Sequence, residues 1–459
     1  MRHLDAPPDV GWLQERLADH LWRDDERPGH VVGVRRIHRR RSLKGDIKSL
    51  YRVTLRGCDD RSLEQTYVGC ELPPDALRTE YESWLSRATI APALGRTVLV
   101  IPEANLLLVA FPNNRQMRVF TSEDLVRWLA DHATVLNKGR RRGPRWQVGD
   151  VETQLMQYHP GHRLTVRCRG MFVAEDGTKQ PFAYIAKQFR KQKRARSVYR
   201  NLVCLTRLLN GSSTLRLPRP MAFDDEAGLI VMEELPGTEL EQVFEVIDLD
   251  PVMFNVGRML AAFHQIPRRV RKSISRRSEL DKVRGAAKTI TGVVPGVLSY
   301  VNECASRCRD VRWNDETPSV LLHGSYRPKH VFVDGGALGL IDVDGIRMGH
   351  PACDLAEFLA ALYFLEAQER ISAPVRRMAS QRFVAGYADE VPWRLQPIAV
   401  LWFLAALLLH KHARKQAQCL DEFREKKVCH LLILAETALR GCEELRGEPS
   451  LEAIWRILP

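Results

Sequence analysis

Short runs of β-favouring, mostly apolar residues separated by polar segments mark residues 31–110 as rich in strands. Val, Ile, Leu, Tyr and Thr recur in the runs, which lie at 31–37, 50–55, 65–70, 97–101 and 106–111. Runs of this length and composition predict β-strands. Between the third and fourth runs, residues 74–87 have their apolar positions at helical spacing. Because a polar and basic break follows at 137–145, we expect an N-terminal α+β module over residues 1–145.

A second strand-rich stretch follows the break. It predicts strands at 151–158, 164–173 and 182–189 and a helix at about 194–209. The order strand, turn, strand, strand, helix therefore occurs twice, although the two stretches share few residues. Two interpretations stay open: an internal duplication of a kinase-type small lobe, and two unrelated antiparallel layers, since hairpins followed by a helix are common.

Helical spacing dominates the chain from Pro251 onward. Helices are predicted at 252–264, 280–290, 351–367, 374–387, 395–418 and 426–445, with a strand-loop-strand segment at 320–341. A β-rich front and an α-rich back, joined near residues 232–237, describe a bilobal α+β architecture in which each half buries its own core. We therefore expect a small lobe with its hinge over residues 146–236 and a helical large lobe over residues 237–459.

Composition narrows the class of protein. With 459 residues, 45% of them apolar and 27% charged, the chain has globular statistics. Its first 25 residues lack the apolar segment of a secretory signal, so we expect a cytoplasmic location. The longest apolar run, 398–409, is shorter than the roughly 18 residues that span a bilayer and predicts a buried helix rather than a membrane span. The ten cysteines show no metal-binding spacing, so reduced thiols are expected.

Positive charge is the strongest compositional bias. The formal net charge is +13, and basic residues form runs at 35–44, 140–145, 187–200 and 268–277. Such runs can release counterions from nucleic-acid phosphates or bind an anionic surface or protein. None of them is interleaved with aromatic residues in a recognised nucleic-acid module, and most charge runs are solvated faces.

Residues 321–356 carry the most informative motif, LLHGSYRPKHVFVDGGALGLIDVDGIRMGHPACDLA. A loop, a hairpin with Asp-Gly-Gly at its bend, a strand ending in Ile-Asp and a helix start with Pro follow one another. The segment resembles the aminoglycoside phosphotransferase and choline kinase family, in which H-G-D-x-x-P-x-N precedes I-D-x-D or I-D-x-G and then D-P-x-x-D-L-A. An ordered match of this density is far more specific than a single short motif.

Three earlier segments resemble the same family. Residues 158–163 (YHPGHR, here called the phosphate turn) resemble its small-lobe turn over the nucleotide phosphates, 185–187 its lysine strand, and 229–237 the hinge between its lobes. The resemblance therefore runs from about residue 151 to the C-terminus and assigns no family to residues 1–145.

The resemblance implies a nucleotide site, with ATP or another nucleotide and Mg²⁺ or Mn²⁺ as cofactors. The nucleotide-binding candidates are Lys187, Gly161, Met232, Glu233 and Glu234. Phosphoryl transfer needs a lysine on the phosphates, oxygen ligands for the metal and an acceptor for the incoming hydroxyl proton. Asp342 matches the family's principal metal carboxylate, and Asp344 follows two residues later. Both aspartates also suit a turn, because Asp readily adopts turn conformations.

The catalytic loop departs from the family pattern at two positions. Ser325 stands where the family has its proton-accepting Asp, and a hydroxyl has no useful basicity near neutral pH. His330 stands where the family has the second metal ligand, Asn, although imidazole suits Mg²⁺ poorly. His323 either takes part in the chemistry or holds the loop by hydrogen bonds, and Asp354 is expected to cap its helix and tie the loop down. No acidic residue lies between 188 and 210 to pair with Lys187.

Three hypotheses follow. The first is a kinase-fold protein that binds a nucleotide or metabolite with impaired or altered phosphoryl transfer. The second is an active small-molecule phosphotransferase with a non-standard base or metal arrangement that includes His330. The third is a binding module for nucleic acid or an anionic surface through the basic runs. The acceptor substrate is not indicated by the sequence.

Overall fold

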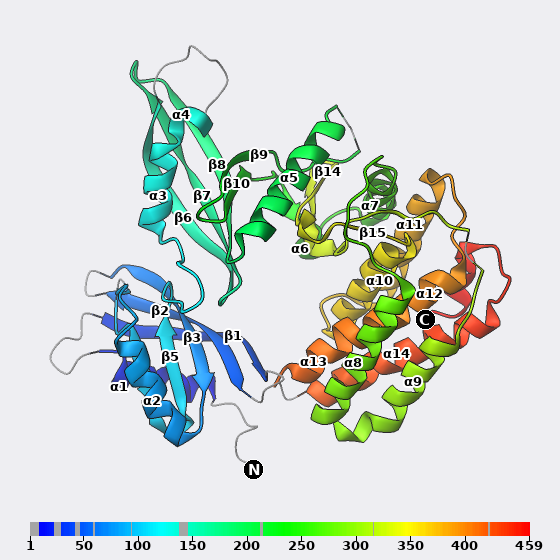
Figure 1. Ribbon diagram of the computed structural model, residues 1–459, viewed down its shortest axis with the longest axis horizontal. Coiled ribbons are helices and arrows are strands. Elements are labelled where there is room, and N and C mark those ends of the chain that lie inside the picture. Colours follow the sequence, from blue (N-terminus) through cyan, green and yellow to red (C-terminus); the bar gives the residue numbers. More distant parts are fainter. Residues whose placement is uncertain are drawn as a thin grey trace. The chain divides into compact units, whose positions relative to one another are not determined.

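The computed structural model describes residues 9–22, 29–41, 46–57, 60–92, 94–136, 146–211, 214–314, 316–420 and 423–459. The predicted break at 137–145, with the basic run 140–145, lies outside these residues, as do positions 42–45 of the run 35–44. The chain divides into two compact units (Figure 1). The first unit comprises residues 1–197, 220–234 and 419–422, and the second comprises 198–219, 235–418 and 423–459.

The first unit contains two antiparallel sheets. The N-terminal sheet has the order β1-β2-β3-β5-β4, formed by β1 (Gly29–Arg41), β2 (Ile47–Gly57), β3 (Ser62–Glu71), β4 (Val98–Ile101) and β5 (Leu106–Ala110). Apolar side chains alternate between its two faces along β5. One face therefore packs against α1 (Val10–His20), and the other packs against α2 (Pro74–Leu85).

The second sheet has the order β6-β7-β8-β10-β9. Its strands are β6 (Trp146–His159), β7 (Arg163–Ala174), β8 (Lys179–Phe189), β9 (Pro220–Asp224) and β10 (Leu229–Glu233). The helices α3 (Ser122–Asp131) and α4 (Ala133–Leu136) lie on one face of this sheet (Figure 1). Leu125, Trp128 and Leu129 of α3 pack into the core on that face. The helix α5 (Gln192–Leu208) follows β8.

The second unit is mainly helical (Figure 1). Its helices are α6 (Leu240–Val243), α7 (Leu249–His264), α8 (Arg276–Val293), α9 (Leu298–Asp310), α10 (Ala352–Ala367), α11 (Ala373–Glu390), α12 (Pro397–Leu407), α13 (Arg414–Gln418) and α14 (Arg424–Glu444). A three-stranded sheet joins β11 (Thr238–Glu239), β13 (Val331–Asp334) and β14 (Ala337–Leu340), and a separate pair joins β12 (Val320–Leu322) and β15 (Arg347–Gly349). Single 3-10 turns lie at Pro102–Ala104, Pro295–Val297, Pro328–His330, Val343–Gly345 and Leu451–Arg456.

The predicted α+β class, with strands before helices, is confirmed. The predicted strands of both stretches and the helices from 252 onward appear close to their expected places. The predicted helix 395–418 is interrupted, since a π-helical turn, Leu408–Ala413, separates α12 from α13. All of α12 is buried, as an all-apolar helix requires. No helix within the described ranges has both the length and the apolarity to cross a membrane.

Within the described residues, five helices have no counterpart in the sequence prediction: α1, α3, α4, α6 and α9. A capping box starts α3, because the Thr121 side chain accepts from the Asp124 N–H and the Asp124 side chain accepts from the Thr121 N–H. That Thr-x-x-Asp spacing is the sequence signal that marks this helix.

Close packing of α7 on α11 supports the large-lobe core and predicts the effect of one substitution. A Cβ added to Gly386 would lie 2.0 Å from the Phe254 carbonyl oxygen, whereas a Cβ added to Gly285 in α8 meets nothing within 4 Å. We expect Gly386→Ala to lower the free energy of unfolding by about 2–3 kcal/mol through overpacking. The matched variant Gly285→Ala should raise it by up to about 1 kcal/mol through helix propensity. Denaturant unfolding measures both, and equal changes would contradict the packing.

Candidate functional site

The loop at residues 323–330 joins β12 to β13 in the second unit. Its Gly324 has φ +77°, and a Cβ there would lie 2.5 Å from the Gly345 carbonyl oxygen, so glycine is required. The loop ends in the 3-10 turn Pro328–His330, whose first residue is proline. These constraints give the loop its path independently of the residues that perform chemistry.

Asp354 holds the start of this loop. Its carboxylate accepts hydrogen bonds from the backbone N–H of His323 at 2.6 Å and of Gly324 at 2.9 Å, and from His264 Nε2 at 3.2 Å. Burial alone would raise the pKa of Asp354, but its hydrogen bond with His264, together with the charges and N–H groups around it, holds that pKa below its usual value. The expected tie between Asp354 and the loop is present. The expected helix cap is wrong, because α10 begins after Pro351 with no side-chain cap.

His323 is fully buried below the loop. Its Nε2 lies 3.0 Å from the Ile341 carbonyl oxygen, so Nε2 carries the proton and donates it. Burial lowers the pKa of this imidazole, which keeps it neutral. The geometry therefore favours the interpretation of His323 as a residue that holds the loop against the strand leading to Asp342.

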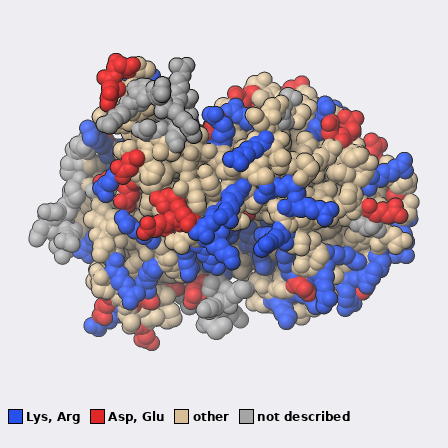
Figure 2. Space-filling model, turned by 45° about the horizontal axis from the view of Figure 1, so that its top comes forward, with Lys and Arg blue, Asp and Glu red and all other residues tan. Residues whose placement is uncertain are grey.

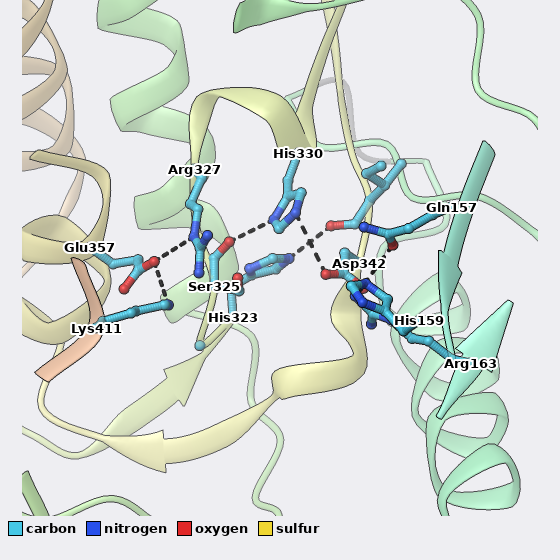
Figure 3. Close-up of polar contacts among 12 residues, drawn as sticks. Gln157, His159, Arg163, His323, Ser325, Arg327, His330, Asp342, Glu357 and Lys411 are labelled. Atoms are coloured by element: carbon cyan, nitrogen blue, oxygen red, sulfur yellow. Dashed lines mark hydrogen bonds and ion pairs between the residues drawn. The ribbon is translucent and has the colours of Figure 1, made fainter. Parts of the chain in front are cut away.

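Ser325 and His330 contact each other through the backbone. His330 Nδ1 lies 2.7 Å from the Ser325 carbonyl oxygen, and since a carbonyl only accepts, Nδ1 is the protonated nitrogen (Figure 3). Burial lowers the pKa of His330 to about 3, more than the nearby Asp342 raises it. The imidazole is therefore neutral near pH 7, and its unprotonated Nε2 faces Asp342 Oδ2 at 3.6 Å.

The two acceptor atoms, His330 Nε2 and Asp342 Oδ2, can share a cation. A donor set of one imidazole nitrogen and one carboxylate suits Mn²⁺ better than Mg²⁺. Asp344 follows on the 3-10 turn Val343–Gly345. Within the described ranges, no group of three or more His, Cys, Asp or Glu side chains is placed to hold a metal. A metal at Asp342 would therefore need further oxygen ligands, such as those of a phosphate.

Asp342 has a left-handed backbone with φ +66° and ψ +45°. This conformation is uncommon outside glycine, although Asp tolerates it better than most residues. Asp342 lies between the end of β14 and the 3-10 turn Val343–Gly345. This position is consistent with both interpretations of Asp342, a metal-binding carboxylate and a turn residue.

A buried charge cluster beside the loop has no counterpart in the sequence prediction. Glu357 of α10 is 2% exposed and binds Arg327 of the loop at 2.5 Å and Lys411 of the π-helical turn, as Figure 3 shows. Burial would raise the pKa of Glu357, but Lys411 and Arg327 lower it to about 2. The buried Glu357 carboxylate therefore fixes Arg327, which lies between Ser325 and His330 in the sequence. The available sequence signal is Glu357 three residues after Asp354, on the same helix face.

The nucleotide-binding candidates lie in the first unit. Lys187 is 8% exposed in β8, between Thr165 of β7 and Ile230 of β10. Gly161 forms the phosphate turn between β6 and β7 with φ +71°. Met232 and Glu233 end β10.

Glu234, within the expected hinge, is engaged by the sheet itself. Arg169 binds its carboxylate through Nε and Nη2, both at 2.9 Å, and Arg167 Nε lies 2.9 Å away. Its backbone N–H donates to the Ala183 carbonyl at 3.0 Å. The side chain of Glu234 therefore fixes the hinge to the strands.

The basic runs are partly internal structure. Arg39 is buried and binds Glu71 through two bonds of 2.6 Å, and Arg196 pairs with Asp225. Arg276 lies over the rings of Trp313 and Trp402. Blue Lys and Arg side chains nevertheless cover more of the face in Figure 2 than red Asp and Glu side chains, in keeping with the net charge of +13.

Comparison with known proteins identifies the class. Residues 171–396 match the model of the phosphotransferase enzyme family, and this part of the chain belongs to that family. No curated protein matches the chain.

Solved structures of kinases of this class are similar to the chain at low identity. An amicoumacin kinase in complex with AMP-PNP, Ca²⁺ and Ami is 14% identical with a TM-score of 0.43, over 69% of this chain and 93% of that chain. A choline kinase from Cryptosporidium parvum is 11% identical with a TM-score of 0.48, over 72% and 99%. A macrolide 2'-phosphotransferase from Brachybacterium faecium is 17% identical with a TM-score of 0.42, over 67% and 98%.

The buried carboxylate of Asp354 predicts a large effect of a nearly isosteric change. In Asp354→Asn, one oxygen that accepts loop N–H groups becomes an NH₂ group, so donors would face donors in a buried site. We expect the free energy of unfolding to fall by about 3 kcal/mol. The control Asp281→Asn breaks an exposed pair with Arg284 and should change stability by less than about 1 kcal/mol. Equal effects in urea unfolding would contradict the role assigned to Asp354.

Proposed function

We propose that this chain binds a nucleotide or a related phosphorylated metabolite and transfers its phosphoryl group slowly or not at all. The observation that carries the proposal is the contact between His330 and Ser325. Ser325 stands at the loop position where the family pattern has its proton acceptor, and His330 stands where it has the second metal ligand.

The two loop positions that depart from the family pattern carry no side chain suited to general-base catalysis near neutral pH. Ser325 has a neutral hydroxyl, and His330, with a pKa of about 3, is too weak a base. Its Nδ1 proton is also held by a carbonyl. Because a positioned base is typically worth about 10²- to 10⁴-fold in rate, its loss slows transfer without removing the capacity to bind.

Features that favour binding remain in the sequence and fold. Lys187 stands at the strand position that carries the phosphate-binding lysine in the family pattern, and Asp342 at the position of the principal metal carboxylate. A metal ion held there by Asp342, with His330 or Asp344, would supply positive charge to the phosphates. Binding therefore keeps its electrostatic basis while the proton-transfer group is absent from the loop.

One form of the second hypothesis, an active phosphotransferase in which His330 serves as the non-standard base, is disfavoured by the same geometry. An imidazole with a pKa of about 3 is unprotonated at neutral pH, but it is too weak a base to draw the proton from an incoming hydroxyl. The third hypothesis is weakened because Arg39, Arg196 and Arg276 are engaged within the fold.

Ligand binding is tested by thermal unfolding with ATP and either Mg²⁺ or Mn²⁺. At an ATP concentration about 100-fold above Kd, binding adds ~2.7 kcal/mol of stability and should raise Tm by several degrees. We expect a larger rise with Mn²⁺ than with Mg²⁺. Lys187→Ala should reduce the rise with either metal, whereas the exposed-residue control Lys191→Ala should not. No rise with either metal would refute nucleotide binding.

Loss of catalysis is tested by restoring the two family residues. The double variant Ser325→Asp, His330→Asn should hydrolyse ATP at least about 10²-fold faster than the wild type, since it regains a base and an amide metal ligand. Adding Asp342→Ala should abolish the gain, which assigns the turnover to this site. A wild type that already turns over at about 1–100 s⁻¹, and loses that activity with Asp342→Ala alone, would instead support the active phosphotransferase.

A further inference from the structure

The two sheets of the first unit share one topology. Each is preceded by a helix, runs through three antiparallel strands, a helix and two further strands, and has the same order of neighbours (Figure 1). The elements α1-β1-β2-β3-α2-β4-β5 thus correspond in order to α3-β6-β7-β8-α5-β9-β10, with the short α4 directly after α3. Two unrelated layers would not be expected to share this whole order of helices and strands.

The turns before the last strands agree in residues as well as in length. Residues 102–105 and 225–228 each place Glu-Ala before a residue with positive φ, Asn105 at +49° and Gly228 at +63°, and a leucine follows in both. This shared turn and left-handed residue connect the final strand pair of each sheet. The short Glu-Ala signature is therefore the clearest sequence trace of a duplication.

Strand register identifies equivalent residues in the two copies. Lys187 pairs with Ile230, the second residue of β10, and Cys70 pairs with Leu107, the second residue of β5. Cys70 therefore occupies the place of Lys187. By the same register, Tyr67 corresponds to Tyr184.

In the first copy, apolar side chains cover the sheet face that carries Cys70. Cys70 packs with Val98, Leu107 and Val109 of the sheet and with Leu77 of α2. Farther along the sheet, Leu50 and Val68 enter an apolar cluster with side chains of the second copy. The first copy has thus lost the lysine and covered the surface on which a nucleotide would lie.

The segment 111–116, which follows β5 as the hinge follows β10, contacts both copies. Its Asn113 side chain bonds to the backbone of Ile90, at 3.1 Å to the N–H and 2.7 Å to the carbonyl. Its Arg115 pairs with Glu80 of α2 at 2.8 Å. These two residues anchor the segment to the first copy.

Two other residues of the segment, Asn114 and Gln116, reach the phosphate turn of the second copy. Asn114 Nδ2 donates to the Tyr158 hydroxyl at 2.7 Å, and Gln116 Oε1 accepts from Arg190 Nη1 at 2.9 Å. A Cβ on Gly161 would lie 2.2 Å from Gln116 Oε1, so the turn's glycine makes room for this side chain. The phosphate turn is thereby held from outside its own sheet.

We infer that the N-terminal module and the small lobe are two copies of one unit, and that the first copy is retained to hold the phosphate turn of the second copy in shape through Asn114 and Gln116. Its role rests on the proposed nucleotide binding, because a preformed turn lowers the entropy lost when a ligand orders it. Gln116 is a positioning residue that acts through Gly161 and Arg190.

Hydrogen exchange of the full-length protein tests the contact without any ligand. In Gln116→Ala, the backbone amides of residues 159–163 should exchange about tenfold faster. The variant lacks the Gln116–Arg190 hydrogen bond and the packing of Gln116 on the turn, so local opening of the turn costs less free energy. Gln116→Glu keeps the acceptor for Arg190 and should exchange like the wild type. The control Gln14→Ala, which removes a bond to the Val32 carbonyl in the first copy, should leave the turn unchanged. Unchanged exchange in Gln116→Ala would overturn the inference.

Nucleotide affinity forms a second, separate arm. With ATP and Mn²⁺, Gln116→Ala should bind about three- to tenfold more weakly, while Cys70→Ala should bind as the wild type does. Tighter binding by Gln116→Ala would overturn the inference, because Gln116 would then obstruct the turn. A wild type that binds no ATP refutes the proposed function alone, and the exchange arm still decides whether the turn is held.

Discussion

The buried carboxylate of Asp354 is the interaction on which the rest of the site depends. It collects two loop N–H groups and the imidazole of His264 in a region without water access, so the loop start has a single favourable path. Gly324 permits that path, and His323 secures the strand behind it. None of these residues needs to act on a substrate. A chain can therefore exchange its proton acceptor for Ser325 and its amide for His330 while the loop keeps its shape, which is the combination found here.

The same separation of scaffold and chemistry explains what the sequence could predict. The ordered motif of residues 321–356 predicted the loop, the hairpin and the buried helix, because each is fixed by local rules for Gly, Pro and apolar spacing. The α+β class followed from the change in periodicity near Pro251. The capping box at Thr121 was a local signal as well, and it identifies α3 once it is sought.

Contacts between residues that lie far apart in the sequence could not be predicted from these local rules. Glu357 meets Lys411 only because a π-helical turn redirects the chain after α12, and Glu234 is held by arginines of a strand 65 residues earlier. The neutral state of His330 arises from burial, which no spacing reveals. The correspondence of the two sheets emerged from strand order and register, since few residues agree and Cys70 lies at the register position of Lys187.

The proposed function combines a retained phosphotransferase scaffold with the loss of its proton acceptor. A crystal structure of the wild type soaked with ATP and Mn²⁺ tests it most directly. We expect intact ATP, a metal ion on Asp342, and the His330 Nδ1 bond to the Ser325 carbonyl preserved. Cleavage of ATP to ADP in the crystal, or a carboxylate from another element in hydrogen-bonding reach of the acceptor position beside the γ-phosphate, would contradict the claim.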